Sequence, residues 1–264
     1  MNNVLSIPSG WLEKLHVVIV GAGGTGSQVL THLARIYHVM KALGREQEIM
    51  VTVIDDDTVS ETNLFRQAFF PSDIGHKKAH VLVQRVNLGF CLNWRAQDVR
   101  LTEENANSLL NDANLVIGAV DSPTARKVIY SMREFFKYKR KDVMWMDCGN
   151  RLDDGQVILG HLSQSCHSAK SQIWVPNAGD LYPDLIDPSI VEEDTPSCSL
   201  EESLAKQSLF VNTGAAVHAC SMLFTLLRYG QLGHHVTYYN VRTCKSTTLP
   251  IDPKTWERLG YVAT

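Results

Sequence analysis

A glycine-rich turn between an apolar strand and a helix constrains the fold of this chain more than any other feature. The segment Leu15–Val20 is short, apolar and rich in β-branched residues, as buried strands are. It leads directly into Gly21-Ala-Gly-Gly-Thr-Gly26, which matches the pattern G-x-G-x-x-G. From Thr25 to Gly44, apolar residues then recur at three- and four-residue steps, which is a helical period. This order of strand, turn and helix predicts the first unit of a nucleotide-binding α/β fold.

The chemistry of the turn favours a phosphate-containing ligand. Four glycines allow backbone N–H groups to approach phosphate oxygens, and the helix N-terminus adds partial positive charge: Gly21, Gly23, Gly24 and Gly26. Asp55 ends the second predicted strand, Glu48–Ile54, where an acidic residue commonly binds ribose hydroxyls. It follows Gly21 by 34 residues, whereas a dinucleotide fingerprint expects about 20, which disfavours a plain oxidoreductase. The glycine motif alone does not separate NAD, FAD and ATP.

Further strands and helices alternate along the first half of the chain. A helix is predicted over Lys78–Asn87 and a third buried strand over Leu115–Val120. Ser122 and Pro123 then supply an N-cap and a first-turn proline for another helix. Such alternation predicts a Rossmann-like, doubly wound α/β fold with a mainly parallel sheet.

The second half of the chain departs from this alternation. Asp153-Asp154-Gly155 is a turn signal between two apolar runs and predicts an antiparallel hairpin of Val143–Met146 with Val157–Leu162. Residues 163–208 are polar, contain four prolines and are predicted to form a long irregular crossover. A helix over Ser208–Tyr229 and C-terminal strands at 236–241 and 246–249 complete the expected single domain, residues 1–264.

Composition limits the partners of the chain. Its 264 residues are 44% hydrophobic and 20% charged, which is enough for a large buried core. The net charge of −3 gives no electrostatic footprint for nucleic acid. The longest apolar runs are too short to cross a bilayer, and the first residues lack the pattern of a secretory signal. We therefore expect a cytoplasmic protein that binds neither nucleic acid nor membranes.

A composite motif after the second strand is far more specific than the glycine turn. It consists of Asp55-Asp-Asp-Thr-Val-Ser-Glu-Thr-Asn-Leu-Phe-Arg-Gln67, followed by Asp73-Ile-Gly-His-Lys-Lys-Ala79. This stretch resembles the signature D-x-D-x-V-x-x-x-N-L-x-R-Q and I-G-x-x-K-A of the ThiF/MoeB/ubiquitin-activating superfamily. Gly118–Arg126 looks like the D-x-x-x-x-R segment of the same superfamily, and the resemblance covers most of residues 15–230. The amino-acid sequence of residues 196–200 and 207–212 is similar to that of ThiF-like proteins of PRTRC plasmid systems.

The resemblance implies ATP-dependent adenylation of the C-terminal carboxylate of a small ubiquitin-like protein. Asp55 would hold the ribose and Asp57 would lie near the phosphates and metal. Lys78, rather than its neighbour Lys77, matches the lysine that would neutralise charge at the α-phosphate. Asp121 would ligate Mg²⁺ together with phosphate oxygens. Directed donors over the triphosphate would come from Asn63, Arg66 and Gln67.

Some of these residues also fit plainer roles. Asn63 could stabilise its own loop, and Arg126 fits the surface of a helix better than a catalytic position, although it could orient Asp121 or the acceptor. For the whole chain, a catalytically idle scaffold that binds ATP or a ubiquitin-like partner remains an alternative. An NAD(P)-dependent oxidoreductase is the less favoured one.

The cysteines raise the question of a covalent second step, because many superfamily members pass the acyl group to a cysteine in the crossover. Cys198 lies in the polar part of the predicted crossover and is the first candidate for a thioester or sulfur-transfer role. The surrounding carboxylates would raise its thiol pKa. Cys166 is the second candidate, and with His161 and His167 it could instead form a loop metal site. Cys148 and Cys220 fit core positions better.

The resemblance also implies partners. The acceptor would be a ubiquitin-like protein ending in glycine, and a conjugating enzyme or a sulfur donor would act after it. A homodimer is expected, although the arginine that dimeric members send from their N-terminal helix is missing here, since Arg35 is the first arginine. No zinc is expected, because the six cysteines form no C-x-x-C pair.

Overall fold

The computed structural model describes residues 3–64, 66–164, 173–190 and 207–262. Within these ranges one sheet of eight strands runs through the molecule, in the order β10-β9-β7-β6-β5-β2-β3-β4. Its strands are β2 (Lys14–Val20), β3 (Glu48–Ile54), β4 (Arg95–Gln97), β5 (Leu115–Gly118), β6 (Val143–Asn150), β7 (Asp154–Ser163), β9 (His234–Asn240) and β10 (Lys245–Pro250).

The sheet is parallel in one part and antiparallel in the other. Strands β6, β5, β2, β3 and β4 are neighbours in that order and each pair is parallel. Strand β7 returns antiparallel along β6, and the β7–β9 and β9–β10 pairs are antiparallel as well. The predicted doubly wound α/β fold with antiparallel C-terminal strands is therefore confirmed.

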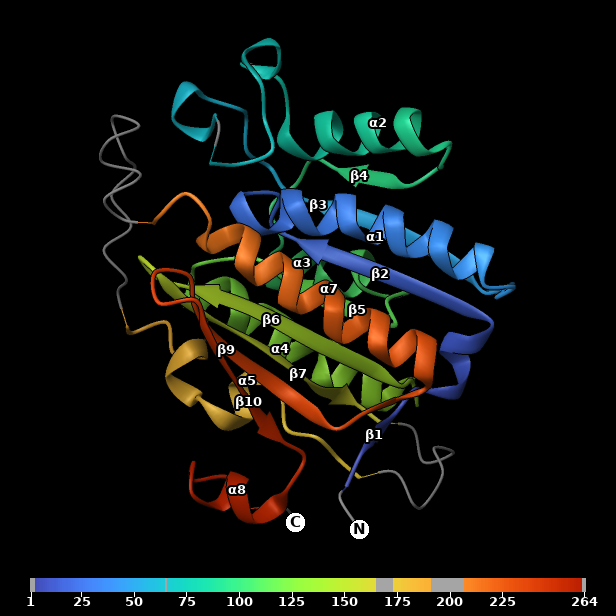
Figure 1. The fold of residues 1–264 in the computed structure, drawn as a ribbon, viewed down its shortest axis with the longest axis vertical. Coiled ribbons are helices and arrows are strands. Elements are labelled where there is room, and N and C mark those ends of the chain that lie inside the picture. The colour runs from blue at the N-terminus through green and yellow to red at the C-terminus, as the bar shows by residue number, and fades with distance from the viewer. Residues whose placement is uncertain (1–2, 65, 165–172, 191–206, 263–264) are drawn as a thin grey trace.

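Helices cover both faces of the sheet (Figure 1). One face carries three helices: α1 (Gly24–Ala42), α2 (Lys78–Phe90) and α7 (Val211–Tyr229). The other carries α3 (Glu103–Leu109) and α4 (Pro123–Tyr138), with α5 (Ala178–Leu181) packed against α4. This double cover explains why the central strands are continuous apolar runs, with β5 buried along its whole length.

The register of the central strands sets up one edge of the sheet. Val20 pairs with Ile54 of β3 on one side and with Gly118 of β5 on the other. The three strands therefore end level with one another. The chain turns toward α1 on one face after β2 and toward α4 on the other after β5 (Figure 1). A crevice forms at such a switch point in doubly wound sheets, so the loops after these strands are where a ligand is expected.

Several elements have no clear signal in the sequence. The periodicity did not predict β4 and α3, because both are short and half-exposed. The pair of β1 (Leu5–Ser6) with β8 (Gln231–Leu232) joins segments far apart in the chain, and α8 (Pro253–Glu257) contains the buried Trp256. Within the expected crossover, α5 and the 3-10 turn Pro183–Ile186 are ordered secondary structure, so residues 163–208 are not irregular throughout.

Candidate functional site

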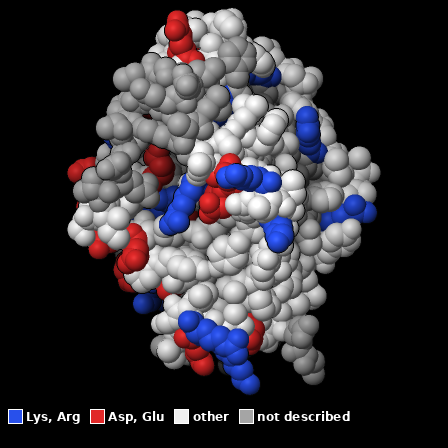
Figure 2. All heavy atoms as spheres, turned by 60° about the vertical axis from the view of Figure 1, so that its left-hand side comes forward, with Lys and Arg blue, Asp and Glu red and all other residues white. Residues whose placement is uncertain are grey.

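A cavity of about 1410 Å³ opens at the carboxyl ends of β2, β3, β5 and β6. The glycine turn, the composite motif, the loop after β5 and the ends of β6 and β7 all contribute to its lining. Figure 2 shows acidic and basic side chains next to one another on this side of the molecule, with neither sign forming a continuous patch. The sequence motifs, which are separated by up to about 100 residues along the chain, therefore share one cavity.

Three glycines of the turn are required by close contacts. Gly21 has φ +93°, and a Cβ there would lie 2.6 Å from the carbonyl oxygen of Ala119. A Cβ on Gly26 would lie 1.9 Å from the Gly21 oxygen, and one on Gly24 would lie 2.4 Å from the Asn212 side chain. Gly23 is not required by a close contact, because a Cβ added there would have no described atom within 4 Å. Gly23 lines the cavity.

The N-terminus of α1 is open toward the cavity. Its N-cap is Gly23, and no side chain among the described residues caps it. The first N–H groups of a helix have no partner within the helix and carry partial positive charge. The turn therefore offers unsatisfied donors to an anion, which is the arrangement that binds phosphate.

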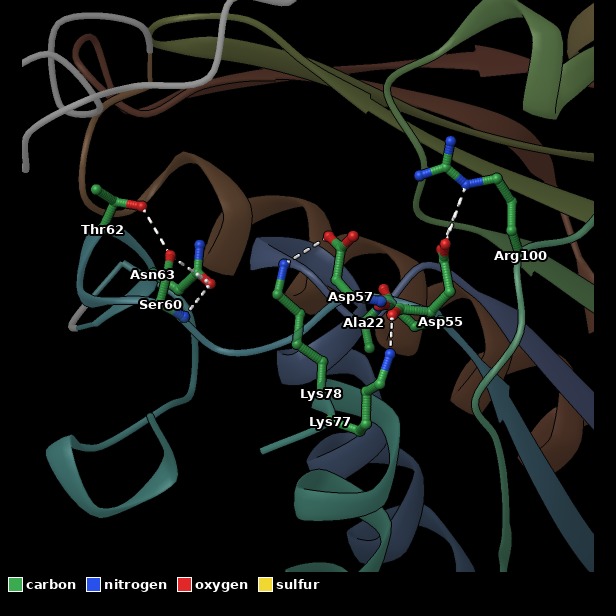
Figure 3. A network of polar contacts seen from close by, with 10 residues as sticks. Ala22, Asp55, Asp57, Ser60, Thr62, Asn63, Lys77, Lys78 and Arg100 are labelled. Atoms are coloured by element: carbon green, nitrogen blue, oxygen red, sulfur yellow. Dashed lines mark hydrogen bonds and ion pairs between the residues drawn. The ribbon is translucent and has the colours of Figure 1, made fainter. Parts of the chain in front are cut away.

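Asp55 holds the glycine turn in place. Its Oδ2 accepts a hydrogen bond of 2.6 Å from the backbone N–H of Ala22, and its Oδ1 accepts one of 2.8 Å from Asp57 (Figure 3). Burial raises the pKa of this carboxyl, while the two backbone hydrogen bonds and Lys78 oppose the rise. Each carboxylate oxygen can accept a further bond, so this structural role leaves room for the ribose contact predicted from the sequence.

Two adjacent lysines point to different places. Lys78 begins α2, its side chain is 7% exposed, and its Nζ lies 2.9 Å from Asp57 Oδ2 inside the cavity (Figure 3). Lys77 instead donates to the backbone oxygen of Asp56 at 2.6 Å and pairs with Asp98 at 3.1 Å. Only Lys78 of the two lines the cavity, which agrees with its assignment from the motif.

The amide of Asn63 is engaged in its own loop. Residues Glu61–Asn63 form a 3-10 turn, and Asn63 Oδ1 accepts from the backbone N–H of Ser60 at 3.0 Å (Figure 3). The plainer role considered for Asn63 is therefore observed in the structure. Gln67 lines the same cavity and is 7% exposed, and its Oε1 has no partner among the described residues.

Arg66 sits half-buried in the cavity wall. Its Nη1 donates to Gln207 Oε1, whereas its buried Nε has no partner among the described residues. Burial lowers the pKa of this guanidinium, and the charge of nearby Asp121 raises it. An Arg stays charged under these conditions, so the buried Nε is a charged donor that lacks an acceptor among the described residues.

Asp121 lies just past β5 on an exposed stretch of the cavity lining. Behind it is a buried ion pair that sequence reasoning missed: Arg126 Nε donates to Asp147 Oδ1 at 3.1 Å, and Asp147 is fully buried. Arg126 Nη1 also donates to the backbone oxygen of Asp121 at 2.8 Å. The expectation that Arg126 lies on a helix surface is wrong, because its side chain is 5% exposed.

The two buried cysteines, Cys148 and Cys220, do not resemble an activated nucleophile. Cys148 lines the cavity, but burial raises its thiol pKa well above the usual value. Burial also raises the pKa of Cys220 to about 12. A thiol is nucleophilic as the thiolate, so both fit structural roles, as expected. Cys198 and Cys166 lie outside the described residues.

His161 does not fit the loop metal site considered for His161, Cys166 and His167. His161 is 2% exposed on β7, and its Nδ1 accepts a hydrogen bond from the backbone N–H of Val175 at 2.9 Å. Burial lowers its pKa to about 4. The side chain is therefore a neutral, hydrogen-bonded part of the core, while His167 lies outside the described residues.

A profile of the ThiF family matches residues 10–255, nearly the whole length of the chain. The chain belongs to the ThiF family. The matched span includes the glycine turn, the composite motif and the loop after β5, so the residues that meet in the cavity all lie within the family domain.

Individual relatives match the ThiF-family chain over shorter stretches. The sulfur carrier protein adenylyltransferase of Thermus thermophilus is 37% identical over 120 residues, which is 45% of this chain and 41% of that protein. An adenylyltransferase and sulfurtransferase of Yarrowia lipolytica is 32% identical over 119 residues, 45% of this chain and 28% of that protein. Ubiquitin-like modifier-activating enzyme 1 of Dictyostelium discoideum is 29% identical over 165 residues, 60% of this chain and 15% of that protein.

Solved structures share the fold at low sequence identity. PaaA superposes with a TM-score of 0.61 and 16% identity, over 90% of this chain and 64% of its own. E. coli MccB, crystallised with ATP, gives a TM-score of 0.57 and 17% identity, over 92% of this chain and 65% of its own. These two structures support the doubly wound fold of the described residues.

Proposed function

We propose that this protein catalyses the ATP-dependent adenylation of the C-terminal carboxylate of a small ubiquitin-like or sulfur carrier protein. The observation that carries the proposal is the convergence of the glycine turn, Arg66, Lys78 and Asp121 on one cavity. Relatives named as adenylyltransferases of a sulfur carrier protein and as a modifier-activating enzyme support the reaction class. These residues come from three separate segments, namely the glycine turn, the composite motif and the loop after β5, and the proposed chemistry needs all of them in one place.

The cavity fits a triphosphate. The uncapped N-terminus of α1 and the open space at Gly23 leave room for phosphate oxygens against the turn. The Arg66 guanidinium lines the cavity and is a charged donor that can contact such an oxygen. Lys78 has three donors and uses one for Asp57, so it can contact a phosphate without breaking that ion pair.

Asp121 fits a magnesium ion carried by the nucleotide. Mg²⁺ in nucleotide sites is commonly held by one or two carboxylates together with phosphate oxygens and water. Among the described residues no group of three or more His, Cys, Asp or Glu side chains is arranged to hold a metal by itself. The exposed Asp121 carboxylate in the cavity is consistent with a metal that arrives with ATP. When bound, it would offset charge on the phosphate oxygens.

In the proposed reaction an oxygen of the acceptor's C-terminal carboxylate attacks the α-phosphorus of ATP. A bond forms between them, the bond from the α-phosphorus to the bridging oxygen breaks, and pyrophosphate leaves with that electron pair. Lys78 stabilises the charge that grows on the α-phosphate oxygens, while Arg66 holds the β- and γ-phosphates in line. Arg126, held by Asp147, fixes the backbone at Asp121. Positioning and charge stabilisation carry the step.

A second step would transfer the acyl group from AMP to a cysteine. In the proposal the Cys198 thiolate attacks the acyl carbon, a thioester forms and AMP leaves with the bonding electrons of the mixed anhydride. The high thiol pKa of Cys148 makes it a poor alternative, although it lines the cavity. A Cys198→Ser variant should keep adenylation and lose a reducible adduct with the acceptor. Persistence of that adduct would assign the step to another thiol.

The test of adenylation is ATP–pyrophosphate exchange in the presence of a ubiquitin-like acceptor ending in glycine. Exchange is expected with the wild-type protein, and Asp121→Ala should lower the exchange rate by a factor of at least about 100. The thermal midpoint of the variant should stay within about 2–4 °C of the wild-type value, which corresponds to about 1 kcal/mol for a chain of this size. Glu46→Ala is the matched control, since this exposed carboxylate precedes β3 at the other end of the sheet. ATP binding without exchange would instead support a scaffold, and binding of NADH in place of ATP would support an oxidoreductase.

A further inference from the structure

A cluster of polar side chains beside Arg66 lines the same cavity, and the reaction proposed above assigns it no step. It is formed by Thr25 of α1, Asn150 at the end of β6, Gln207, and Asn212 in the first turn of α7. Thr25 and Asn212 are 4% and 3% exposed. These four residues, here called the amide cluster, come from distant parts of the chain and meet beside the glycine turn.

The hydrogen bonds of the amide cluster are mutually consistent. Asn150 Nδ2 donates to Thr25 Oγ1 at 3.2 Å and to Asn212 Oδ1 at 3.1 Å, and Thr25 Oγ1 donates to Asn212 Oδ1 at 3.2 Å. Asn150 Oδ1 in turn accepts from Gln207 Nε2 at 2.8 Å. Polar networks in which every member is satisfied are rigid, because each bond fixes the orientation of the next group.

This network fixes the amide of Gln207 in one orientation. Its Nε2 must face the acceptor on Asn150, which leaves its Oε1 facing two donors, Asn212 Nδ2 at 3.2 Å and Arg66 Nη1. A glutamine can serve as donor at one end and double acceptor at the other, whereas a glutamate lacks the donor. The reversed amide would place Nε2 against two donors, so the orientation is determined.

We propose that Gln207 is the positioning residue for Arg66, and that the amide cluster locks the Arg66 guanidinium against the phosphate-binding side of the cavity. The proposal rests on the proposed function for the identity of the ligand. Arg66 is otherwise a long side chain with many rotamers, and ordering it at the moment of binding would weaken the affinity for nucleotide. The cluster lowers that cost, because the guanidinium lines the cavity and is already held through Nη1.

The proposal makes Thr25 and Arg66 two ends of one rigid unit. Thr25 belongs to the glycine turn and Arg66 to the composite motif, so the two phosphate-binding segments are connected through Asn150 and Gln207 rather than through the sheet alone. Gln207 also lines the cavity, so the test must separate an effect on ATP binding that passes through Arg66 from a direct contact with ATP.

A double-mutant cycle on Arg66 and Gln207 tests this dependence. The dissociation constant of Mg-ATP is measured by calorimetry for the wild type, Gln207→Ala, Arg66→Ala and the double variant. Gln207→Ala is expected to weaken binding by at least about tenfold, as for a lost hydrogen bond to a charged group. In the Arg66→Ala background the same change should alter binding by less than about twofold, because no guanidinium remains to be positioned.

Controls separate positioning from folding. Gln84→Ala, on the exposed face of α2, should leave ATP binding unchanged in both backgrounds. If Gln207→Ala lowers the thermal midpoint so far that binding is not measurable, Gln207→Met keeps a side chain of similar length and is used in the same cycle. Equal factors in both backgrounds would overturn the proposal, since Gln207 would then act independently of Arg66.

The cycle also distinguishes this proposal from the proposed function. ATP binding with strong coupling and no pyrophosphate exchange would support the positioning role and reject adenylation. Pyrophosphate exchange without coupling between Gln207 and Arg66 would support adenylation and reject the positioning role. A wild-type protein that does not bind Mg-ATP would overturn both.

Discussion

Removal of the Asp147 carboxylate should destabilise this protein far more than the loss of an ordinary ion pair. Asp147 is fully buried and accepts from Arg126, whose side chain is 5% exposed. In Asp147→Leu the guanidinium would remain in the core without its counter-charge. Breaking a buried pair in this way typically costs about 3–5 kcal/mol.

That cost converts into a measurable shift of the thermal midpoint. For a chain of this size, about 1 kcal/mol corresponds to roughly 2–4 °C, so a loss of at least about 6 °C is expected for Asp147→Leu in differential scanning calorimetry. Glu48→Gln is the control, because Glu48 pairs with Lys14 at 3.4 Å on the surface and both side chains are more than half exposed. Its effect should stay below about 1 kcal/mol.

The double variant Arg126→Met with Asp147→Leu distinguishes the two roles of the pair. With both charges gone, no group is left buried and unpaired, so most of the stability should return. Pyrophosphate exchange should nevertheless stay below about a tenth of the wild-type rate, since a tenfold loss needs only 1.4 kcal/mol and the backbone of Asp121 has lost its hydrogen bond from Arg126.

Two results would refute this reasoning. A midpoint for Asp147→Leu no lower than that of Glu48→Gln would show that the buried charge is compensated in another way. A double variant that is as unstable as the sum of the two single ones would show that the pair does not act as a unit.

The two adjacent lysines and two buried histidines give two further tests. Lys78→Met should abolish pyrophosphate exchange, because of the two lysines only Lys78 lines the cavity. Lys77→Met should keep at least about half of the exchange rate, a change of less than about 0.5 kcal/mol. Equal losses in the two variants would reject the assignment of Lys78 to the phosphates. Burial lowers the pKa values of His161 and His235 to about 4, so both are neutral in the fold and the unfolded chain binds more protons between pH 4 and 6.5. Stability should therefore be full above pH 6.5 and fall as the pH drops toward 4, and His235→Gln should flatten this dependence in thermal scans at pH 5–7; an unchanged slope would exclude His235 as a source.

The sequence could predict the parts of the fold that depend on local pattern. The apolar run before Gly21, the helical period after Thr25 and the aspartate after Ile54 are each contained in a short window, and the structure has the corresponding strand, helix and loop there. The glycine turn was recognisable for the same reason, because its strained geometry needs glycine at particular positions. The choice of Lys78 over Lys77 came from the motif, and the structure gives its physical basis in the direction of the two side chains.

The contacts that complete the cavity depended on tertiary structure alone. Asn150, Gln207 and Asn212 follow no motif that would connect them to Thr25, which precedes them by more than a hundred residues. The burial of Arg126 was predicted wrongly for the same reason, since a charged residue in the first turns of a helix looks exposed until its partner Asp147 is found on a neighbouring strand. Local sequence determines what a segment can form, because backbone periodicity and turn geometry act over a few residues. Which polar groups are buried against one another is decided only when the sheet brings distant strand ends together, because the energy of a buried charge or amide depends on the partner it meets there.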